Sequence, residues 1–214
     1  MPGKNTRLLA GRPLLEYTAR AAHDSGVLDR VVLSTDSADI AECGRRAGLE
    51  VPFMRPHELA QDDSPMLPVI EHALDELQRA GWEPEIVVLL QPTSPLRTPQ
   101  HIRSAIELLD RSGADSVVTV VAVPLHLSPD YVMRIEDGRL RPFLPEGSRV
   151  VRRQDARPAY SRDGTVYACR TASLRRFGTM YGEDCRPLVI DAAESLSIDT
   201  AADWAVAERA LASR

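Results

Sequence analysis

The sequence predicts an α/β protein in which helices cover a sheet that contains parallel strands. Two observations lead to this prediction. Short β-branched and apolar runs recur along the first two-thirds of the chain, and segments with apolar residues at helical spacing lie between them. Strands that are joined through helices are typically parallel, with right-handed crossovers. The first two-thirds is therefore expected to form a layered α/β sheet.

Each element of this part has its own local signal. Ser64-Pro65 and Thr98-Pro99 place a capping side chain before a proline, which is tolerated in the first helical turn. Glycines close most of the helical segments. The expected elements are helices over 14–26, 40–48, 64–81 and 98–113, and strands over 31–33, 86–90 and 117–123.

The remaining third has a different pattern. Alternating apolar residues over 131–135, a type I′ turn at Asp137-Gly138 and a return strand from Leu140 predict a hairpin that projects from the sheet. Further strands are expected over 165–169 and 188–190. Thr200 and Asp203 form a capping box for a last helix. Without repeats or long linkers, residues 1–214 are expected to form one domain, with 124–150 as its arm.

Composition excludes several classes of protein. The chain has 214 residues, 31 of them acidic and 26 basic, and a formal net charge of −5. An acidic chain is poorly suited to sequence-independent binding of nucleic acid, which depends on neutralising phosphates. No apolar run approaches the roughly 18–20 residues of a membrane span, and the start lacks a signal-peptide pattern. We expect a cytoplasmic protein with no membrane or nucleic-acid partner.

Cysteines and histidines are too few and too scattered for a disulfide framework or a zinc site. They are interpreted as reduced thiols and surface imidazoles: Cys43, Cys169, Cys185, His23, His57, His72, His101 and His126. Lys4 is the only lysine among the 26 basic residues. It marks either a site that needs a compact ammonium group or a chance survivor in an arginine-rich composition.

Four segments can carry chemistry. Pro2-Gly3-Lys4-Asn5 places a glycine and a lysine where they can approach phosphate oxygens. Gln91–Arg97 directly follows the strongest predicted strand, where open α/β sheets bind ligands. Residues 149–162 hold five arginines, which suits an anionic ligand. Asp199 lies between a strand end and a helix, and one or two carboxylates often suffice for Mg²⁺.

Each segment also has a plain structural interpretation. Pro2–Asn5 can be a disordered terminus, and Gln91–Arg97 a rigid turn stiffened by its two prolines. The arginines can lie on a solvated face or a dimer surface. Asp199 can complement the dipole of the helix that follows it. No single segment decides between these interpretations.

Taken together, the segments resemble the acylneuraminate cytidylyltransferase family, the CMP-sialic acid synthetases, and more distantly the synthetases that activate Kdo. The likeness spans essentially the whole chain. The resembling stretches are Pro2–Asn5, Leu33–Asp36, Arg55–Ala60, Leu90–Arg97, Arg153-Gln154, Tyr160, Asp163-Gly164, Tyr167 and Ile198–Thr200.

The resemblance implies a Rossmann-like nucleotidyltransferase fold of the GT-A-like kind, with a mixed sheet and a hairpin arm that forms a homodimer. It implies attack by the anomeric hydroxyl of a nonulosonic acid on the α-phosphate of CTP, with Mg²⁺ as cofactor. Such a transfer needs positioning and charge neutralisation more than covalent help.

The resemblance also assigns residue roles by position. Lys4 and Arg97 match catalytic positions. The nucleotide contacts are Lys4, Asn5, Arg55 and Ser94; the sugar-acid contacts are Gln154, Tyr160 and Gly164; the metal ligand is Asp199.

The chain departs from the family pattern at three points. A strand and a glycine- and arginine-bearing loop are expected before Pro2, so the sheet should lack its first, central strand here. Ser197 stands where the sialic-acid branch usually has an aspartate, and Asp163 replaces a usual asparagine. These departures leave two hypotheses: a cytidylyltransferase, or a homologue of the same fold that binds the nucleotide or sugar acid without turnover.

Overall fold

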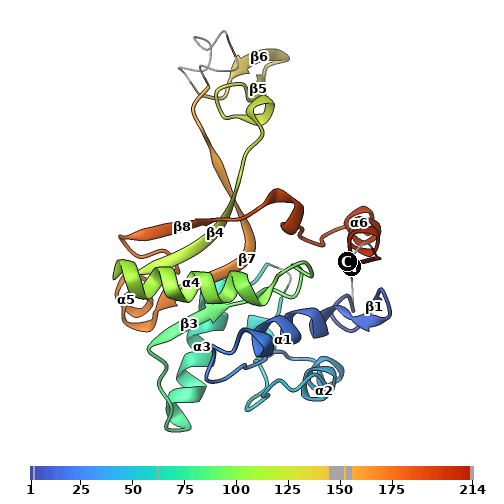
Figure 1. Ribbon diagram of the computed structural model, residues 1–214, viewed down its shortest axis with the longest axis vertical. Helices are drawn as coiled ribbons and strands as arrows, with labels where there is room; N and C mark the ends of the chain where they lie inside the picture. The colour runs from blue at the N-terminus through green and yellow to red at the C-terminus, as the bar shows by residue number, and fades with distance from the viewer. Residues whose placement is uncertain (2, 62, 145–151, 153–155, 213–214) are drawn as a thin grey trace.

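A computed structural model describes residues 1, 3–61, 63–144, 152 and 156–212. Its main sheet has four strands in the order β3-β7-β4-β8. The strands are β3 (Ile86–Leu89), β4 (Ser116–Ala122), β7 (Tyr160–Arg170) and β8 (Cys185–Val189). Figure 1 shows helices on both sides of this sheet and a long arm that leaves the body.

Alternating residues of the strands serve two apolar layers, as a pleated strand requires. One layer joins β4 and β7 to α1 (Leu14–Ser25) and α4 (Pro99–Ser112), with Ile102 and Val166 fully buried in it. The other joins β3 and β7 to α3 (Met66–Arg79) and α5 (Thr171–Phe177) through residues such as Leu74 and Cys169. The α/β class predicted from the sequence is therefore confirmed.

The predicted parallel pairing of neighbouring strands is wrong for β3 and β4. β7 lies between them and pairs antiparallel with both, and β4 pairs parallel with β8. Hydrophobic periodicity shows which segments are strands but not their order in the sheet, so a late strand that inserts between two earlier ones cannot be seen in it.

The predicted strand over 31–33 is also wrong as a strand, because it is reduced to an isolated parallel bridge between Val32 and Glu50. Leu33 N donates to Glu50 O at 2.8 Å, and Glu50 N donates to Val31 O at 2.9 Å. On its other side lies a cavity of about 430 Å³, lined by this segment, β3 and apolar residues of α3. Because none of the described residues pairs with the segment across that cavity, its hydrogen bonding does not extend beyond the bridge.

Most predicted helix ends are confirmed. α1 ends at Gly26 and α4 at Gly113, both with positive φ. Thr98 caps α4 by accepting from His101 N at 3.3 Å. The predicted cap at Ser64 is wrong: α3 begins after Pro65 without a side-chain cap, and Ser64 Oγ instead accepts from Gln61 N at 3.0 Å.

A smaller layer covers one end of the body. It consists of β1 (Leu8–Leu9), β2 (Arg12–Pro13) and α6 (Ala201–Ala212), packed on the start of α1. α2 (Ala38–Arg46) packs on α1 through a separate apolar cluster. Ile198 is fully buried in the smaller layer beside Trp204 of α6. Thr200 and Asp203 cap α6 reciprocally, as predicted, with Thr200 N 2.7 Å from Asp203 Oδ2 and Asp203 N 3.3 Å from Thr200 Oγ1. Ile198 thus anchors the segment that precedes α6.

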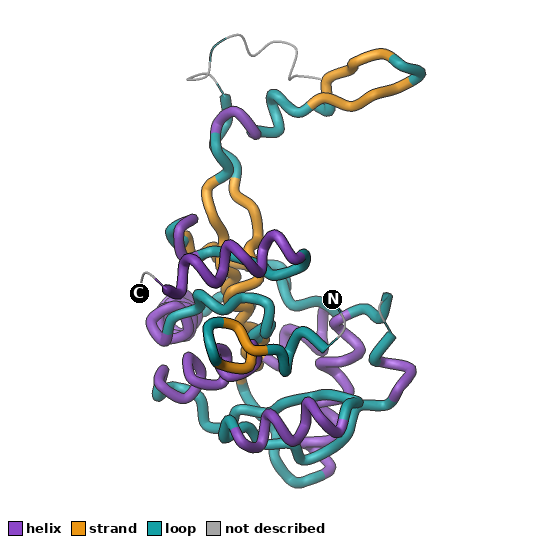
Figure 2. The backbone as a smooth tube through the Cα atoms, turned by 90° about the vertical axis from the view of Figure 1, so that its right-hand side faces the viewer, coloured by secondary structure: helices purple, strands orange, loops and turns teal. Residues whose placement is uncertain are grey.

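The arm carries a hairpin of β5 (Met133–Glu136) and β6 (Arg139–Pro142), which lies outside the body in both Figure 1 and Figure 2. Asp137 and Gly138 both have positive φ, 50° and 71°, which confirms the predicted type I′ turn. At its base, buried Asp130 accepts from Arg157 N at 2.8 Å and pairs with the Arg157 guanidinium. This contact lowers the pKa of Asp130 and ties the two legs of the arm together.

None of the helices in the described ranges is long and apolar enough to cross a membrane.

Candidate active site

Three segments from distant parts of the chain meet beyond the carboxyl end of β3. The loop Gln91–Arg97 follows β3, and Thr93 O accepts from Ile198 N at 2.9 Å. Lys4 Nζ in turn donates to Ile198 O at 3.2 Å. The structure therefore brings together three of the four segments that the sequence singles out.

Lys4 and Asp199 lie side by side at this junction, with Nζ 3.8 Å from Asp199 Oδ1. Their side chains are 27% and 69% exposed, so both groups can be reached by a ligand. An exposed ion pair contributes little to stability. The ammonium group can therefore turn to a phosphate oxygen, and the carboxylate to a metal ion, at small cost.

The backbone around Asp199 is fixed by its neighbours. Asp199 N and Thr200 N both donate to Asp203 Oδ2, at 3.1 and 2.7 Å. The hydrogen bond from Thr200 Oγ1 to Asp203 Oδ2 at 2.8 Å, together with these two backbone bonds, lowers the pKa of Asp203. Ser197 Oγ donates to Asp199 Oδ2 at 3.1 Å. Ser197 stands where the resembling family usually has an aspartate. Its hydroxyl thus supplies an oxygen beside the Asp199 carboxylate.

A second group of polar atoms lies where the Gln91–Arg97 loop meets β7. Ser94 is 2% exposed, and its Oγ has no hydrogen-bond partner among the described residues. Gly164 has φ +80°, and a Cβ there would come within 3.0 Å of Gln91 Oε1 and 3.8 Å of Ser94 Oγ. A side chain at position 164 would therefore press against Gln91, next to the unpartnered Ser94 hydroxyl.

Arg97 is buried beneath these groups. Its Nε donates to Thr165 O at 2.5 Å, Nη1 to Thr18 Oγ1 at 2.7 Å and Nη2 to Gln91 O at 2.6 Å. Burial lowers the pKa of Arg97 to about 9, against the attraction of the Asp163 carboxylate. The catalytic contact predicted for Arg97 stays a prediction. In this structure the guanidinium holds β7, α1 and the loop together.

Arg55 and Asn5 are each held by contacts outside these two groups. Arg55 Nε donates to Ser34 Oγ at 3.1 Å, and its Nη2 to Ser34 O. Burial lowers the pKa of Arg55, against the attraction of Asp36. Asn5 O accepts from Leu15 N at 2.9 Å, which fixes the segment of Lys4 to the start of α1. Neither residue shows by contact which part of a nucleotide it would meet.

The predicted sugar-acid residues are only partly placed. Gly164 lies beside Gln91, whereas Tyr160 is 56% exposed at the start of β7, opposite Ala122 of β4. Gln154, Arg149 and Arg153 lie outside the described residues. Of the arginine-rich segment, Arg157 pairs with Asp130 and Arg162 donates to Tyr181 Oη.

Three contributors to the site were not predicted from the sequence. The sequence indicates Gln91 only as part of the Gln91–Arg97 loop, and Ser197 only as a difference from the family pattern. His101 was interpreted as a surface imidazole, which is wrong: it is buried, caps α4 and lies 3.1 Å from Glu194. The spacing of Thr98 and His101 is that of a capping box, but histidine is not one of the side chains that usually complete it.

The donor set fits Mg²⁺ better than a closed transition-metal site. No cluster of three or more histidine, cysteine or acidic side chains suited to a metal occurs in the described part of the chain. Mg²⁺ typically takes one or two carboxylates and completes its shell with water and phosphate oxygens. The exposed Asp199 carboxylate with Ser197 Oγ beside it meets that requirement.

An α/β sheet with an ammonium group, an exposed carboxylate and an unpartnered hydroxyl beyond a strand end suits a nucleotide-binding transferase. Comparison with known proteins specifies which one. A family model described as cytidylyltransferase matches residues 1–197. The chain belongs to this cytidylyltransferase family, and it is an enzyme of the nucleotidyltransferase class.

Its relatives narrow the class further. The chain is 36% identical to a CMP-N,N'-diacetyllegionaminic acid synthase of Legionella pneumophila, over 98% of this chain and 89% of that protein. It is 32% identical to N-acylneuraminate cytidylyltransferase A of Danio rerio, over 98% of this chain but 47% of that protein. The chain thus spans nearly all of the bacterial relative and about half of the fish protein.

Solved structures confirm the fold. A CMP:2-keto-3-deoxy-manno-octonic acid synthetase, solved with CTP, superposes with a TM-score of 0.73 at 14% identity, covering 100% of this chain and 93% of that one. A 4-diphosphocytidyl-2C-methyl-D-erythritol synthase from Anaerococcus prevotii gives 0.65 at 14% identity, covering 97% and 93%. The predicted nucleotidyltransferase architecture is confirmed by both.

Proposed function

We propose that this cytidylyltransferase joins CMP from CTP to the anomeric hydroxyl of a sialic-acid-like nonulosonic acid. The observation that carries the proposal is the meeting of Lys4, Asp199 and the Gln91–Arg97 loop at one sheet edge. The hydroxyl oxygen bonds to the α-phosphorus, the bond to the pyrophosphate oxygen breaks, and the hydroxyl proton is released. The binding-only alternative is not favoured, since the named relatives are synthases and transferases.

Each site residue has a role in the proposed transfer that follows from its chemistry. Lys4 neutralises charge on the triphosphate, and Ser94 Oγ donates to a nucleotide oxygen from its buried position. The resemblance assigns Asn5 and Arg55 to the cytidine, and Gln154, Tyr160 and Gly164 to the sugar acid. Asp199, with Ser197 beside it, would hold Mg²⁺, which supplies neutralisation of phosphate charge. Arg97 keeps Gln91 and Thr165 in place.

N,N'-diacetyllegionaminic acid is the acceptor we expect to be used best. This proposal is supported by the higher identity to the legionaminic acid synthase, 36%, than to the N-acylneuraminate enzyme, 32%. The test compares kcat/KM for diacetyllegionaminate, N-acetylneuraminate and Kdo at fixed CTP. A preference for Kdo over both nine-carbon acids would contradict the proposed acceptor class.

Replacing Asp199 with asparagine is expected to weaken transfer in a way that extra Mg²⁺ partly restores, because a neutral amide is a poorer ligand for a hard cation. The measurement is the initial rate as a function of Mg²⁺ concentration. Asp24→Asn is the matched control, because Asp24 is exposed in the last turn of α1. An unchanged Mg²⁺ requirement in Asp199→Asn would remove the metal assignment.

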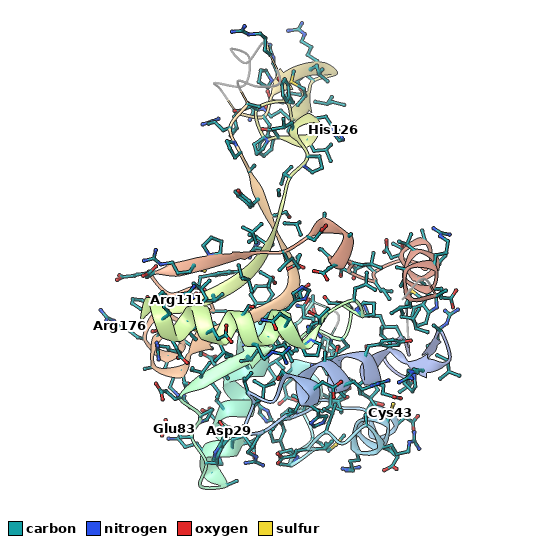
Figure 3. All side chains as sticks on the ribbon, in the orientation of Figure 1. Asp29, Cys43, Glu83, Arg111, His126 and Arg176 are labelled. Carbon is teal, nitrogen blue, oxygen red and sulfur yellow. The ribbon has the colours of Figure 1, made fainter. Side chains whose placement is uncertain are left out.

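We propose that the arm forms a homodimer with the arm of a second copy. Ile135 and Leu140 face each other across the hairpin and are 76% and 64% exposed. A two-stranded hairpin is marginally stable by itself, and an exposed apolar cluster indicates a contact surface. Further exposed apolar side chains of the arm are Leu125, Leu127, Met133 and Phe143. Figure 3 labels His126, which lies within this arm, away from the sheet.

The double substitution Ile135→Asp and Leu140→Asp is expected to convert the dimer to a monomer, because it places charges in an apolar contact. Sedimentation equilibrium gives the mass. Val206→Asp is the control, because Val206 is exposed on α6 of the body. A wild-type protein that is already monomeric, or a double variant that stays dimeric, would contradict the role of the arm.

We also propose that one more strand belongs in the apolar cavity between residues 31–33 and β3. The cavity separates two extended segments whose facing edges need partners. Extending the chain upstream of Met1 by the codons that precede it in the gene is expected to add about five or six apolar strand residues and to raise Tm. A stop codon directly upstream, or an unchanged Tm of the extended chain, would contradict this.

A further inference from the structure

A contact between His101 and Glu194 links two parts of the chain that lead to the site. His101 lies in the first turn of α4, and its side chain is 9% exposed. Its Nδ1 accepts from Thr98 N at 3.3 Å, and its Nε2 lies 3.1 Å from Glu194 Oε2. Because Nδ1 is an acceptor, the ring proton lies on Nε2 and is donated to Glu194. Both ring nitrogens of His101 thus form hydrogen bonds.

The two partners stand directly before and after the segments that build the site. His101 follows the Gln91–Arg97 loop by one helical turn. Glu194 ends a 3₁₀ turn (Ala192–Glu194), from which the chain runs to Ile198 and Asp199. Ile198 is fully buried and bonds to Thr93 O. The stretch 194–198 is therefore held at both ends by the stretch 93–101.

We propose that His101 and Glu194 are positioning residues for nucleotidyl transfer, which set the place of Ser197 and Asp199 against the Gln91–Arg97 loop. The inference rests on the proposed function, because it assigns the contact to the metal requirement of that site. Ile198 alone fixes one end of a short segment, whereas the second attachment at Glu194 limits how the backbone between them can turn. That backbone carries Ser197, whose Oγ donates to Asp199.

Substitutions can separate this role from the helix cap that His101 also provides. His101→Glu keeps an acceptor for Thr98 N, since glutamate is the usual residue at this capping position, but it places a carboxylate against Glu194. Glu194→Ala removes the partner without touching the cap. The double variant His101→Glu with Glu194→Lys restores an attraction across the same contact. Glu107→Gln, on the exposed face of α4, is the control.

The measurement is the Kd for Mn²⁺, which replaces Mg²⁺ in the experiment. The EPR signal of free Mn²⁺, recorded in the presence of CTP, gives the fraction bound. We expect His101→Glu and Glu194→Ala each to raise the Kd for Mn²⁺ by roughly 10-fold, the lower end of the effect that is seen when groups supporting a metal ligand are lost. The Mg²⁺ concentration for half-maximal transfer should rise in parallel. The double variant should recover most of the loss in both, and Glu107→Gln should match the wild type.

An unchanged Kd for Mn²⁺ in both single variants would overturn the proposal. If the Tm of these variants also fell, the contact between His101 and Glu194 would be purely structural. Wild-type protein that binds Mn²⁺ and CTP tightly but transfers to none of the three sugar acids would contradict the proposed function. The positioning role would still be supported in that case by weaker Mn²⁺ binding in the variants. The two failures are therefore distinguishable.

Discussion

Lys4→Ala is expected to lower kcat by roughly 10²–10³-fold, the effect of losing one preorganised group that stabilises transition-state charge. Lys4 lies where the Gln91–Arg97 loop and the Ile198–Asp199 segment meet. A small hydrophobic side chain there leaves the charge on the departing pyrophosphate without its ammonium partner. Steady-state kinetics with saturating CTP and acceptor measures the loss.

Two further variants sharpen this test. Lys4→Arg keeps the positive charge but replaces a compact ammonium with a planar fork, so we expect partial activity. Arg12→Met removes a nearby exposed cation that pairs with Glu16 and should leave kcat unchanged. An unchanged kcat in Lys4→Ala would show that Lys4 is not part of the active site.

Arg97→Lys is expected to destabilise the protein by about 4 kcal/mol, because one ammonium cannot serve the three acceptors that the guanidinium reaches. Each buried acceptor left without a donor costs about 1–3 kcal/mol. For a chain of this size the loss corresponds to a fall in Tm of roughly 10 °C. Thermal unfolding monitored by circular dichroism gives the value, and activity should fall with it as the Gln91–Arg97 loop loosens.

Arg111→Lys is the matched control, because Arg111 is exposed in the last turn of α4 and surface substitutions usually change stability by less than about 0.5 kcal/mol. A variant Arg97→Lys with wild-type Tm and a lost kcat would contradict the positioning role. It would assign Arg97 instead to direct contact with the substrate, as the sequence resemblance implies.

The sequence predicts most of the helices because their signals are local. Thr98-Pro99 and the glycines at 26 and 113 specify helix ends through contacts within one turn. The same holds for Asp137-Gly138, where both residues adopt positive φ in the hairpin turn. Ser64-Pro65 carries the same signal as Thr98-Pro99, yet Ser64 bonds within its preceding loop. Its tertiary surroundings decide which backbone group its hydroxyl meets.

Long-range pairing is the part of the fold that local signals do not contain. The apolar run 31–33 has strand composition, but a strand also needs neighbours, and within the described ranges Glu50 alone pairs with it. β7 takes its place between β3 and β4 through a connection that includes the whole arm. Neither outcome follows from periodicity, which reports the face that a segment buries and not its partners.

The candidate site likewise has features that local signals predict and contacts between distant residues that they do not. The motifs and the family resemblance single out Lys4, Ser94, Gly164 and Asp199. The structure pairs Lys4 with Asp199 and sets Gly164 beside Ser94, while their roles stay predictions. His101 was missed because its partner Glu194 is 93 residues away and no spacing rule connects them. The inward direction of the Arg97 guanidinium was also beyond the sequence, since an arginine after a strand end can face either a ligand or the interior.

The central claim is most directly tested by acceptor-dependent release of pyrophosphate. The 214-residue chain is given CTP and Mg²⁺, with diacetyllegionaminate, N-acetylneuraminate, Kdo or no acceptor, and pyrophosphate and the CMP-sugar are quantified together. The account predicts equal amounts of the two products with a nine-carbon acid and none without an acceptor. Release of pyrophosphate that does not depend on any acceptor, or tight CTP binding with no product from any of the three acids, would contradict it.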